Sequence, residues 1–325
     1  MPELPDIELY LHALRPRIVG RRLERIRLAS PFLVRSFDPP LEHVHGKTVT
    51  GLRRLGKRLV WEMDDELFLV IHLMIAGRFR WAAGITAADD TDDVDQGSFD
   101  ARPKIPGRVG LAAFDFPNGT LLLTEAGSKR RASMHVVKGE RSLEAHDPGG
   151  IDVLTASVDA FAAALTRDNH TLKRALTDPH LLSGIGNAYS DEILHASKLS
   201  PMQLTSRLSR DQIATLHAEA IRILTKWRDD LIAATGDGFP GKVTAFRDGM
   251  AAHGRYGKAC PACGTAIQRI QYASNEANYC PTCQTGGKLL ADRGLSRLLK
   301  NDWPRSLEEL EAMKEGRRQK AEGKS

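Results

Sequence analysis

The four cysteines of this 325-residue chain form two C-x-x-C pairs, Cys260 with Cys263 and Cys280 with Cys283. Two such pairs supply the four thiolates of a tetrahedral Zn²⁺ site without needing a large hydrophobic core. Two disulfide bonds would instead require an oxidising compartment, which nothing in the sequence suggests. The spacing therefore predicts one structural Zn²⁺ in a zinc finger. Zinc ribbons serve polymerases, ribosomal proteins, chaperones and nucleases alike, so the motif alone does not define a function.

The chain begins Met1-Pro2-Glu3, and these residue types could perform covalent catalysis. Removal of Met1 would leave Pro2 with a free secondary amine, and an α-amine with a pKa of about 8 is partly unprotonated at neutral pH. Such an amine can attack an aldehyde or a sugar C1′ and form an iminium ion, while Glu3 could transfer protons. Alternatively, Pro2 and Glu3 are ordinary residues before a helix, and the two residues alone favour that simpler interpretation.

Gly184 and Gly186 precede Asn187 at a turn between two expected helices. Glycines let a phosphodiester approach the backbone N–H groups, and the start of the following helix favours an anion. The segment is typical of a helix-hairpin contact with DNA. A lone G-x-G at a helix–helix turn often serves backbone geometry only, but here it accompanies the N-terminal proline and the four cysteines.

The elements that must position these residues change in type along the chain. Apolar residues at helical spacing predict a helix over 5–18. Alternating apolar residues predict strands of a β-rich domain over 59–63, 67–73, 110–116 and 121–124. Helical spacing then predicts helices over 153–165, 172–176, 188–197 and 211–231. An acidic segment over 87–107 is expected to be a solvated loop, and a charged tail follows the cysteines.

Composition and charge narrow the function classes. The net charge of +5 and the pI near 9.0 suit a polyanionic partner, although many enzymes are this basic. No segment approaches the roughly 20 apolar residues of a membrane span, and no signal segment is evident. We therefore expect a bacterial cytoplasmic protein, associated with the nucleoid, that has neither a membrane partner nor a nucleotide cofactor.

Five ordered motifs carry a family resemblance: Met1-Pro2-Glu3-Leu4-Pro5, Gly56-Lys57, His72-Leu73, Gly184-x-Gly186-Asn187-x-Tyr189 and the two cysteine pairs. With these motifs the chain resembles the formamidopyrimidine-DNA glycosylase/endonuclease VIII family of base-excision repair enzymes. The resemblance implies an α+β multidomain fold. Its expected parts are an N-terminal helix with a two-layer β-sandwich over 1–150, a helical helix-two-turn-helix domain over 151–250, a four-cysteine zinc finger over 251–290 and a charged extension over 291–325.

The resemblance also implies a catalytic mechanism. Pro2 would attack C1′ of a damaged nucleotide flipped out of the duplex, Glu3 would protonate the ring oxygen, and Lys57 would contact a phosphate and assist strand cleavage. The implied DNA-binding residues are His72, Ile75, Arg130, Arg131, Lys173, Gly184, Gly186, Asn187, Tyr189 and Asn275. Two of these roles have alternatives: Lys57 could belong to a solvated basic cluster, and His72 could be a satisfied core histidine.

Three positions differ from the family pattern. Asn275 stands where many members have an arginine that binds phosphate, and a neutral amide cannot form the same charged fork. Ile75 matches a wedging methionine; Met74, one residue away, would face the opposite side of a strand. The segment 125–133 keeps two arginines but lacks the phenylalanine of the oxidised-purine branch. The sequence therefore leaves open whether an oxidised purine, an oxidised pyrimidine, an abasic site or another lesion is the substrate.

These observations predict a monomeric, bifunctional DNA glycosylase and abasic-site lyase that acts on damaged duplex DNA. One alternative is a non-catalytic, lesion- or structure-specific DNA-binding protein derived from the same family. A third interpretation, an RNA-associated zinc-ribbon protein, explains the cysteines but neither the N-terminus nor the glycine turn.

Overall fold

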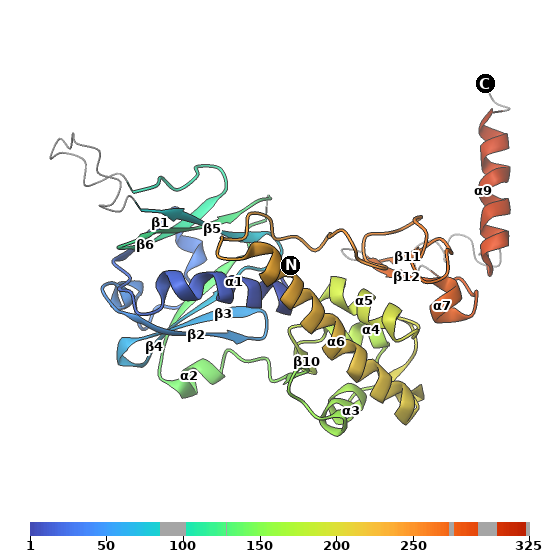
Figure 1. The fold of residues 1–325 in the computed structure, drawn as a ribbon, viewed down its shortest axis with the longest axis horizontal. Helices are drawn as coiled ribbons and strands as arrows, with labels where there is room; N and C mark the ends of the chain where they lie inside the picture. Colours follow the sequence, from blue (N-terminus) through green and yellow to red (C-terminus); the bar gives the residue numbers. More distant parts are fainter. Residues whose placement is uncertain (85–101, 128, 273–275, 292–303, 323–325) are drawn as a thin grey trace. The chain divides into compact units, whose positions relative to one another are not determined.

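The computed structural model describes residues 1–84, 102–127, 129–272, 276–291 and 304–322 (Figure 1). The chain divides into two compact units. The N-terminal unit comprises Met1–Gly149 and Thr225–Ala245, and the C-terminal unit comprises Gly150–Leu224 and Phe246–Ser325. The sequence suggested consecutive segments, whereas the chain returns to the first unit through 225–245. None of the helices in the described ranges combines the length and the apolar character needed to cross a membrane.

The N-terminal unit contains two antiparallel four-stranded sheets and one long helix. Its helices are α1 (Leu4–Ile18) and α2 (Glu140–Glu144). One sheet has the order β1-β6-β7-β5, formed by Arg25–Leu28, Gly110–Phe116, Gly119–Glu125 and Gly77–Ala83. The other has the order β2-β3-β4-β8, formed by Val49–Leu55, Arg58–Met63, Leu67–His72 and Ser133–Lys138.

The two sheets and α1 share one hydrophobic core. Apolar residues of α1 repeat at helical spacing, and Ile7, Tyr10 and Leu14 are fully buried within that core. Between the sheets, the rings of Trp61 and Phe114 lie 5.1 Å apart, centroid to centroid. The expected N-terminal helix and two-layer β-sandwich are therefore confirmed, because apolar faces of both sheets and of the helix are buried against one another.

The C-terminal unit is mainly helical, and a two-stranded hairpin lies between α6 and α7 in the chain (Figure 1). Its helices are α3 (Val158–Thr166), α4 (Leu172–Thr177), α5 (Asn187–Ala196), α6 (Arg210–Thr235, which ends within 225–245), α7 (Pro281–Thr285) and α9 (Leu307–Glu322). Its strands are β9 (Ile151–Asp152), β10 (Leu182–Ser183), β11 (Gln268–Gln271) and β12 (Glu276–Tyr279). The expected helical domain and zinc-finger hairpin are confirmed.

One expected helix begins later than its periodicity suggests. Apolar spacing predicts a helix from Val153, whereas α3 starts at Val158. Ile151 and Asp152 instead pair with the residues just before the glycine turn, in a short parallel ladder with β10. Ser157 then caps the helix, since its Oγ accepts a hydrogen bond from the Ala160 amide at 3.2 Å. A local cap and a distant strand partner therefore override the helical periodicity of this segment.

Candidate functional sites

Pro2 and Glu3 are both buried immediately before α1. Glu3 is the N-cap residue, and it forms a reciprocal capping box with Asp6, whose Oδ2 accepts a hydrogen bond from the Glu3 amide at 2.9 Å. Pro5 occupies the first turn, where its missing N–H costs nothing. The first turn of α1 therefore holds the proposed nucleophile and the proposed acid in a defined position.

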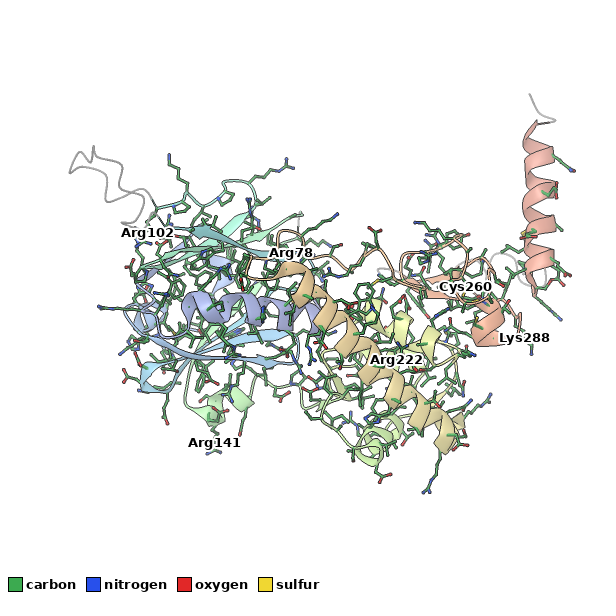
Figure 2. All side chains as sticks on the ribbon, in the orientation of Figure 1. Arg78, Arg102, Arg141, Arg222, Cys260 and Lys288 are labelled. Atoms are coloured by element: carbon green, nitrogen blue, oxygen red, sulfur yellow. The ribbon has the colours of Figure 1, made fainter. Side chains whose placement is uncertain are left out.

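The α-amine of the chain has a lowered pKa. In this structure the amine belongs to Met1, and burial is the largest cause of the decrease; nearby Arg78 and Lys57 lower it further, while Glu3 and Asp6 oppose them. Arg78 lies on β5 (Figure 2), where its Nε donates to the Val243 carbonyl oxygen at 2.6 Å. An amine in this environment is more often neutral, and a neutral amine is the nucleophilic form.

Lys57 lies in the turn between β2 and β3, after Gly56, whose φ of 62° explains the glycine. Burial lowers the pKa of the Lys57 ammonium, and the Glu3 carboxylate partly offsets this effect. The neighbouring Arg53 and Arg54 differ, because each pairs with a carboxylate, Arg53 with Glu140 and Arg54 with Glu8. The desolvation of Lys57 argues against its being one of a solvated basic cluster.

His72 ends β4, where burial, and to a lesser extent the nearby Arg58, Lys57 and His135, together lower its pKa to about 4. Its Nε2 is shielded from solvent and has no hydrogen-bond partner among the described residues, so His72 is not a satisfied core histidine. Ile75 follows in a turn and is 56% exposed, as a wedge requires. The strand argument about Met74 is wrong: β4 ends at His72, and Met74 lies in the turn with a φ of 52°.

Arg130 and Arg131 are exposed in the loop between β7 and β8. Buried Glu125 anchors this loop, because its carboxylate accepts hydrogen bonds from the amides of Arg131 and Ala132, both within 3.1 Å. Both side chains are accessible to a polyanion. Asn275 lies outside the described residues, so its contact with DNA stays a prediction, and so does the character of most of the acidic segment 87–107.

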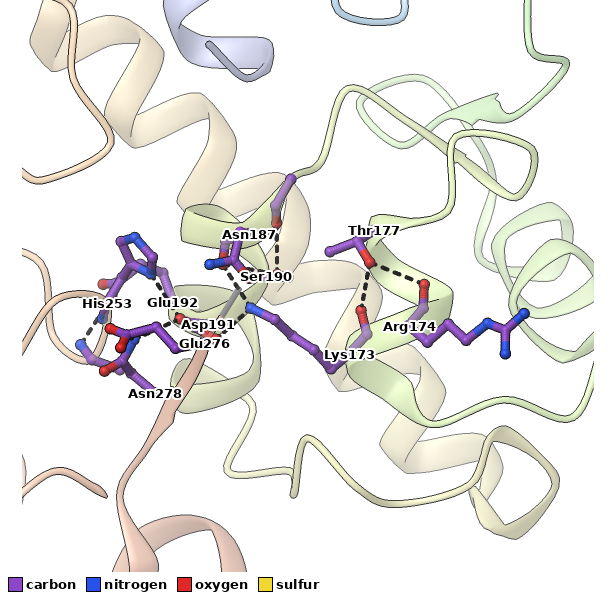
Figure 3. Close-up of polar contacts among 12 residues, drawn as sticks. Lys173, Arg174, Thr177, Asn187, Ser190, Asp191, Glu192, His253, Glu276 and Asn278 are labelled. Atoms are coloured by element: carbon purple, nitrogen blue, oxygen red, sulfur yellow. Dashed lines mark hydrogen bonds and ion pairs between the residues drawn. The ribbon is translucent and has the colours of Figure 1, made fainter. Parts of the chain in front are cut away.

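The glycine turn leads directly into α5. Gly184 has a φ of 84°, a conformation that favours glycine, and Gly186 is the N-cap residue before Asn187. The Nζ of Lys173, on α4, donates to the Asn187 carbonyl oxygen at 2.7 Å and pairs with the Asp191 carboxylate (Figure 3). Lys173 therefore supports the turn from inside the unit.

Asp191 and Glu192 join α5 to later parts of the C-terminal unit (Figure 3). Asp191 Oδ2 lies 2.8 Å from His253 Nδ1 and accepts a bond from Asn278 Nδ2 at 3.3 Å. Glu192 accepts three backbone N–H bonds, from residues 251, 252 and 253, at 2.7 to 2.9 Å. We call Lys173, Asp191, Glu192, His253 and Asn278 the Asp191 network.

Two predicted DNA-binding side chains are buried. Lys173 is 7% exposed and Tyr189 is 1% exposed. The ammonium of Lys173 is already neutralised by Asp191, so little of its charge is available to a phosphate. Their roles in DNA binding stay predictions, and their burial favours indirect support of Asn187 over direct contact.

The four cysteine sulfurs lie within 4.8 Å of one another. Sγ of Cys263 is 3.4 Å from that of Cys280, and Sγ of Cys260 is 4.0 Å from that of Cys283. A tetrahedral site with Zn–S bonds of about 2.3 Å places its sulfurs roughly 3.8 Å apart, so this donor set fits Zn²⁺. None of the four is in a disulfide bond. The expected metal ligands are thus together, at the base of the β11–β12 hairpin.

Sequence reasoning missed several residues of these sites. Arg78 and Asp6, which affect the pKa of the α-amine, carry no motif. His253 and Asn278 likewise carry none, because their partner Asp191 is 62 and 87 residues away. The adjacent acids at 191 and 192 were a visible signal, since two carboxylates on one helix after a glycine turn require partners when they are buried.

Three family models match successive parts of the chain. The formamidopyrimidine-DNA glycosylase N-terminal domain matches residues 1–115, and the formamidopyrimidine-DNA glycosylase H2TH domain matches residues 150–229. A zinc finger found in FPG and IleRS matches residues 257–286, which include the four cysteines. The matches therefore include α1, strands β1 to β5, the glycine turn and the hairpin.

Curated relatives and solved structures agree with these models. An uncharacterized formamidopyrimidine-DNA glycosylase-like protein of Mycobacterium tuberculosis is 42% identical over 151 residues, 46% of this chain and 94% of that protein. The formamidopyrimidine-DNA glycosylase of Lactobacillus johnsonii is 28% identical over 87% of this chain and 99% of its own.

Two solved complexes with DNA are also similar to the chain. Lactococcus lactis Fpg with abasic-site DNA has a TM-score of 0.71 and 25% identity, covering 87% of this chain and 99% of that one. MutM with DNA containing carbocyclic 8-oxo-G has a TM-score of 0.72 and 26% identity, covering 87% of this chain and 100% of that one. By its fold, its N-terminal and glycine-turn geometry, its clustered cysteines and these matches, the chain belongs to the formamidopyrimidine-DNA glycosylase family.

Proposed function

We propose that this protein is a DNA glycosylase of base-excision repair with an associated abasic-site lyase activity, and that Pro2 is its nucleophile. The observation that carries the proposal is the burial of Pro2 and Glu3 immediately before α1, next to an α-amine and a Lys57 ammonium whose pKa values are both lowered. Removal of Met1 would leave the free α-amine on Pro2, which is itself buried. The proposal further expects a monomer that acts on duplex DNA.

The proposed reaction begins at C1′ of the damaged nucleotide. The nitrogen lone pair of Pro2 forms a bond to C1′, the bond from C1′ to the base breaks, and the base leaves with the proton that the Pro2 nitrogen loses. Glu3 then donates its proton to the ring oxygen as the bond from C1′ to that oxygen breaks and the sugar opens. The product is an iminium ion between Pro2 and C1′. Loss of a proton from C2′ then expels the 3′ phosphate, and Lys57 stabilises that leaving anion.

Binding is assigned to exposed or backbone groups. In the N-terminal unit, Arg130 and Arg131 are accessible to phosphates, and Ile75 can fill the space that an extruded base leaves. In the C-terminal unit, Asn187 and the backbone of Gly184 and Gly186 are suited to a phosphate beside the lesion. A Zn²⁺ held by the four cysteines would maintain the shape of the hairpin and take no part in the reaction.

The substrate class is proposed from the chain and its relatives together. The similar structures hold DNA with an abasic site, with carbocyclic 8-oxo-G and, in one Lactococcus lactis complex, with an oxidized pyrimidine. This chain keeps the basic pair at 130 and 131 but has Ala132 where the oxidised-purine branch has phenylalanine. We therefore propose an oxidised base as the substrate and expect incision of abasic DNA as well.

Borohydride trapping on DNA tests the proposal. The zinc-loaded protein is incubated with duplexes that contain an abasic site, 8-oxoguanine or an oxidised pyrimidine, reduced, digested and analysed by mass spectrometry. We expect a covalent adduct on the nitrogen of Pro2 and no Met1 on the active fraction. Glu8→Gln, which changes another carboxylate of α1, one that pairs with Arg54, is the matched control and should trap equally well.

Absence of an adduct, or an adduct on a lysine, would contradict the role of Pro2. The alternative function, a non-catalytic lesion-binding protein, predicts selective binding to the same duplexes without adduct or incision. Parallel binding and incision assays on one panel therefore separate the two functions.

A further inference from the structure

A histidine on α5 contacts one of the four cysteines. His195 lies in the last turn of α5, and its Nε2 is 3.2 Å from Sγ of Cys260. Both residues are buried, His195 at 8% and Cys260 at 2% exposed. This contact joins residues 65 positions apart in the sequence, and neither the expected zinc ligand set nor the proposed DNA contacts include His195.

A zinc-bound thiolate is stabilised by a hydrogen-bond donor, and this contact could supply one. Such a sulfur keeps much of its negative charge, so a buried thiolate without a hydrogen-bond donor is readily protonated or oxidised and then releases the metal. An imidazole N–H that donates to the sulfur stabilises the thiolate, and partners of this kind are known to strengthen metal binding. Since Nε2 is the atom facing the sulfur, the required donor is the N–H of that nitrogen.

The position of His195 on α5 adds a mechanical consequence. Asn187, Asp191 and His195 recur every four residues and therefore lie along one side of the helix. Asp191 contacts Asn278 on β12, and His195 contacts Cys260 before β11, so both sides of the hairpin are attached to this one helix. A third link connects the segments that follow α5 and the hairpin: Gln284 Nε2, on α7, donates to the carbonyl oxygen of Leu199 at 2.8 Å.

We propose that His195 is a positioning residue of the zinc site, donating a hydrogen bond from Nε2 to the Cys260 thiolate, so that it slows release of Zn²⁺ and attaches the zinc finger to α5. The inference rests on the proposed zinc ion and does not depend on the proposed glycosylase activity.

A matched pair of substitutions tests the hydrogen bond. The amide nitrogen of glutamine can occupy the place of Nε2, whereas that of asparagine reaches only the place of Nδ1. We expect His195→Gln to retain zinc like the wild type. We expect His195→Asn to lose zinc about tenfold faster or more, the usual effect of removing such a partner. Ser197→Ala, which removes a buried hydroxyl that donates to the Ile193 carbonyl oxygen, is the control and should not change release.

Zinc release is measured on the full-length protein, with excess chelator and a metallochromic indicator. Substitution of the metal with Co²⁺ supplies a second readout, because loss of the hydrogen bond raises the energy of the sulfur electrons. The thiolate-to-cobalt band should therefore move to longer wavelength in His195→Asn and stay in place in His195→Gln. A purely structural role for His195 would not produce this spectral difference.

Equal release rates and equal cobalt spectra in the two variants would overturn the inference. So would a wild-type protein that contains no zinc, which elemental analysis detects before any kinetic measurement. If His195→Asn fails to fold with zinc, the cobalt spectrum of His195→Gln decides, since a shifted band there shows that a donor at the Nε2 place does not account for the site.

Discussion

Two clusters of ionisable groups in this protein are organised in opposite ways. Around the N-terminus, the α-amine, Lys57 and His72 are all desolvated bases with lowered pKa values. In the Asp191 network, the Lys173 ammonium contacts a carboxylate and a carbonyl oxygen, and Glu192 accepts three backbone N–H bonds. In the first cluster, desolvation and neighbouring cations outweigh the acidic groups Glu3 and Asp6, whereas the second supplies a partner for each of these charges.

This difference in pairing indicates that the first cluster is suited to reaction and the second to holding its neighbours in place. A buried base without sufficient partners shifts towards its neutral form, and a neutral amine can attack carbon. A buried ion pair with additional hydrogen bonds holds its neighbours in one arrangement, and breaking it leaves an uncompensated charge. We therefore assign the N-terminal cluster to chemistry and the Asp191 network to the positioning of Asn187 and the hairpin.

Loss of the acid in the N-terminal cluster should have the largest effect. Glu3→Gln keeps the size of the side chain but removes its proton, so excision of the base should slow by about 10³-fold, within the usual range for general acid–base catalysis. Single-turnover assays on the preferred lesion duplex measure this rate. Binding to the same duplex should change little; an equal loss of binding and rate would assign Glu3 to structure and remove the contrast between the clusters.

Breaking the Asp191 network should mainly lower the free energy of unfolding. Asp191→Asn leaves the buried Lys173 ammonium without its counter-charge, which should lower the free energy of unfolding by about 3 kcal/mol. Denaturant titration of the zinc-loaded protein measures the loss. Ser157→Ala, which removes the cap of α3 in the same unit, provides the comparison and should cost only about 1 kcal/mol.

The double variant Lys173→Met with Asp191→Leu sharpens this prediction. It removes both charges together, so it should regain part of the stability that Asp191→Asn loses. A double variant less stable than the single one would mean that the pair contributes net stability in its own right.

The smallest effect concerns pH. The pKa of His72 is lowered to about 4 in the folded protein, against about 6.5 in an unfolded chain. Between these values the unfolded state binds more protons, so the contribution of His72 is fully present above pH 6.5 and is lost as the pH falls towards 4. Urea titrations from pH 7 to pH 4.5 measure how steeply the free energy of unfolding falls with pH. In His72→Phe this slope should be shallower than in the wild type, by at most about 1.4 kcal/mol per pH unit. An unchanged slope would mean that His72 is solvated.

Features carried by adjacent residues were predictable from the sequence. The two C-x-x-C pairs identify the metal ligands, because a thiolate site needs four sulfurs and the chain has only four cysteines. The N-terminal helix, the strand hairpins and the glycine turn follow from local spacing. The late start of α3 was missed because its cap at Ser157 competes with apolar periodicity, and a strand partner 31 residues away decided the outcome.

The protonation and pairing of the site residues could only be decided by the tertiary structure. The sequence by itself determined which groups are present: an amine next to a glutamate, a lysine after a glycine, and four thiols. Whether Lys57 is desolvated, whether Lys173 is already paired with Asp191, and whether His195 faces Cys260 depend on segments brought together from distant positions. Burial and pairing set the energy of a charge, and both are properties of the folded surroundings rather than of the residue type.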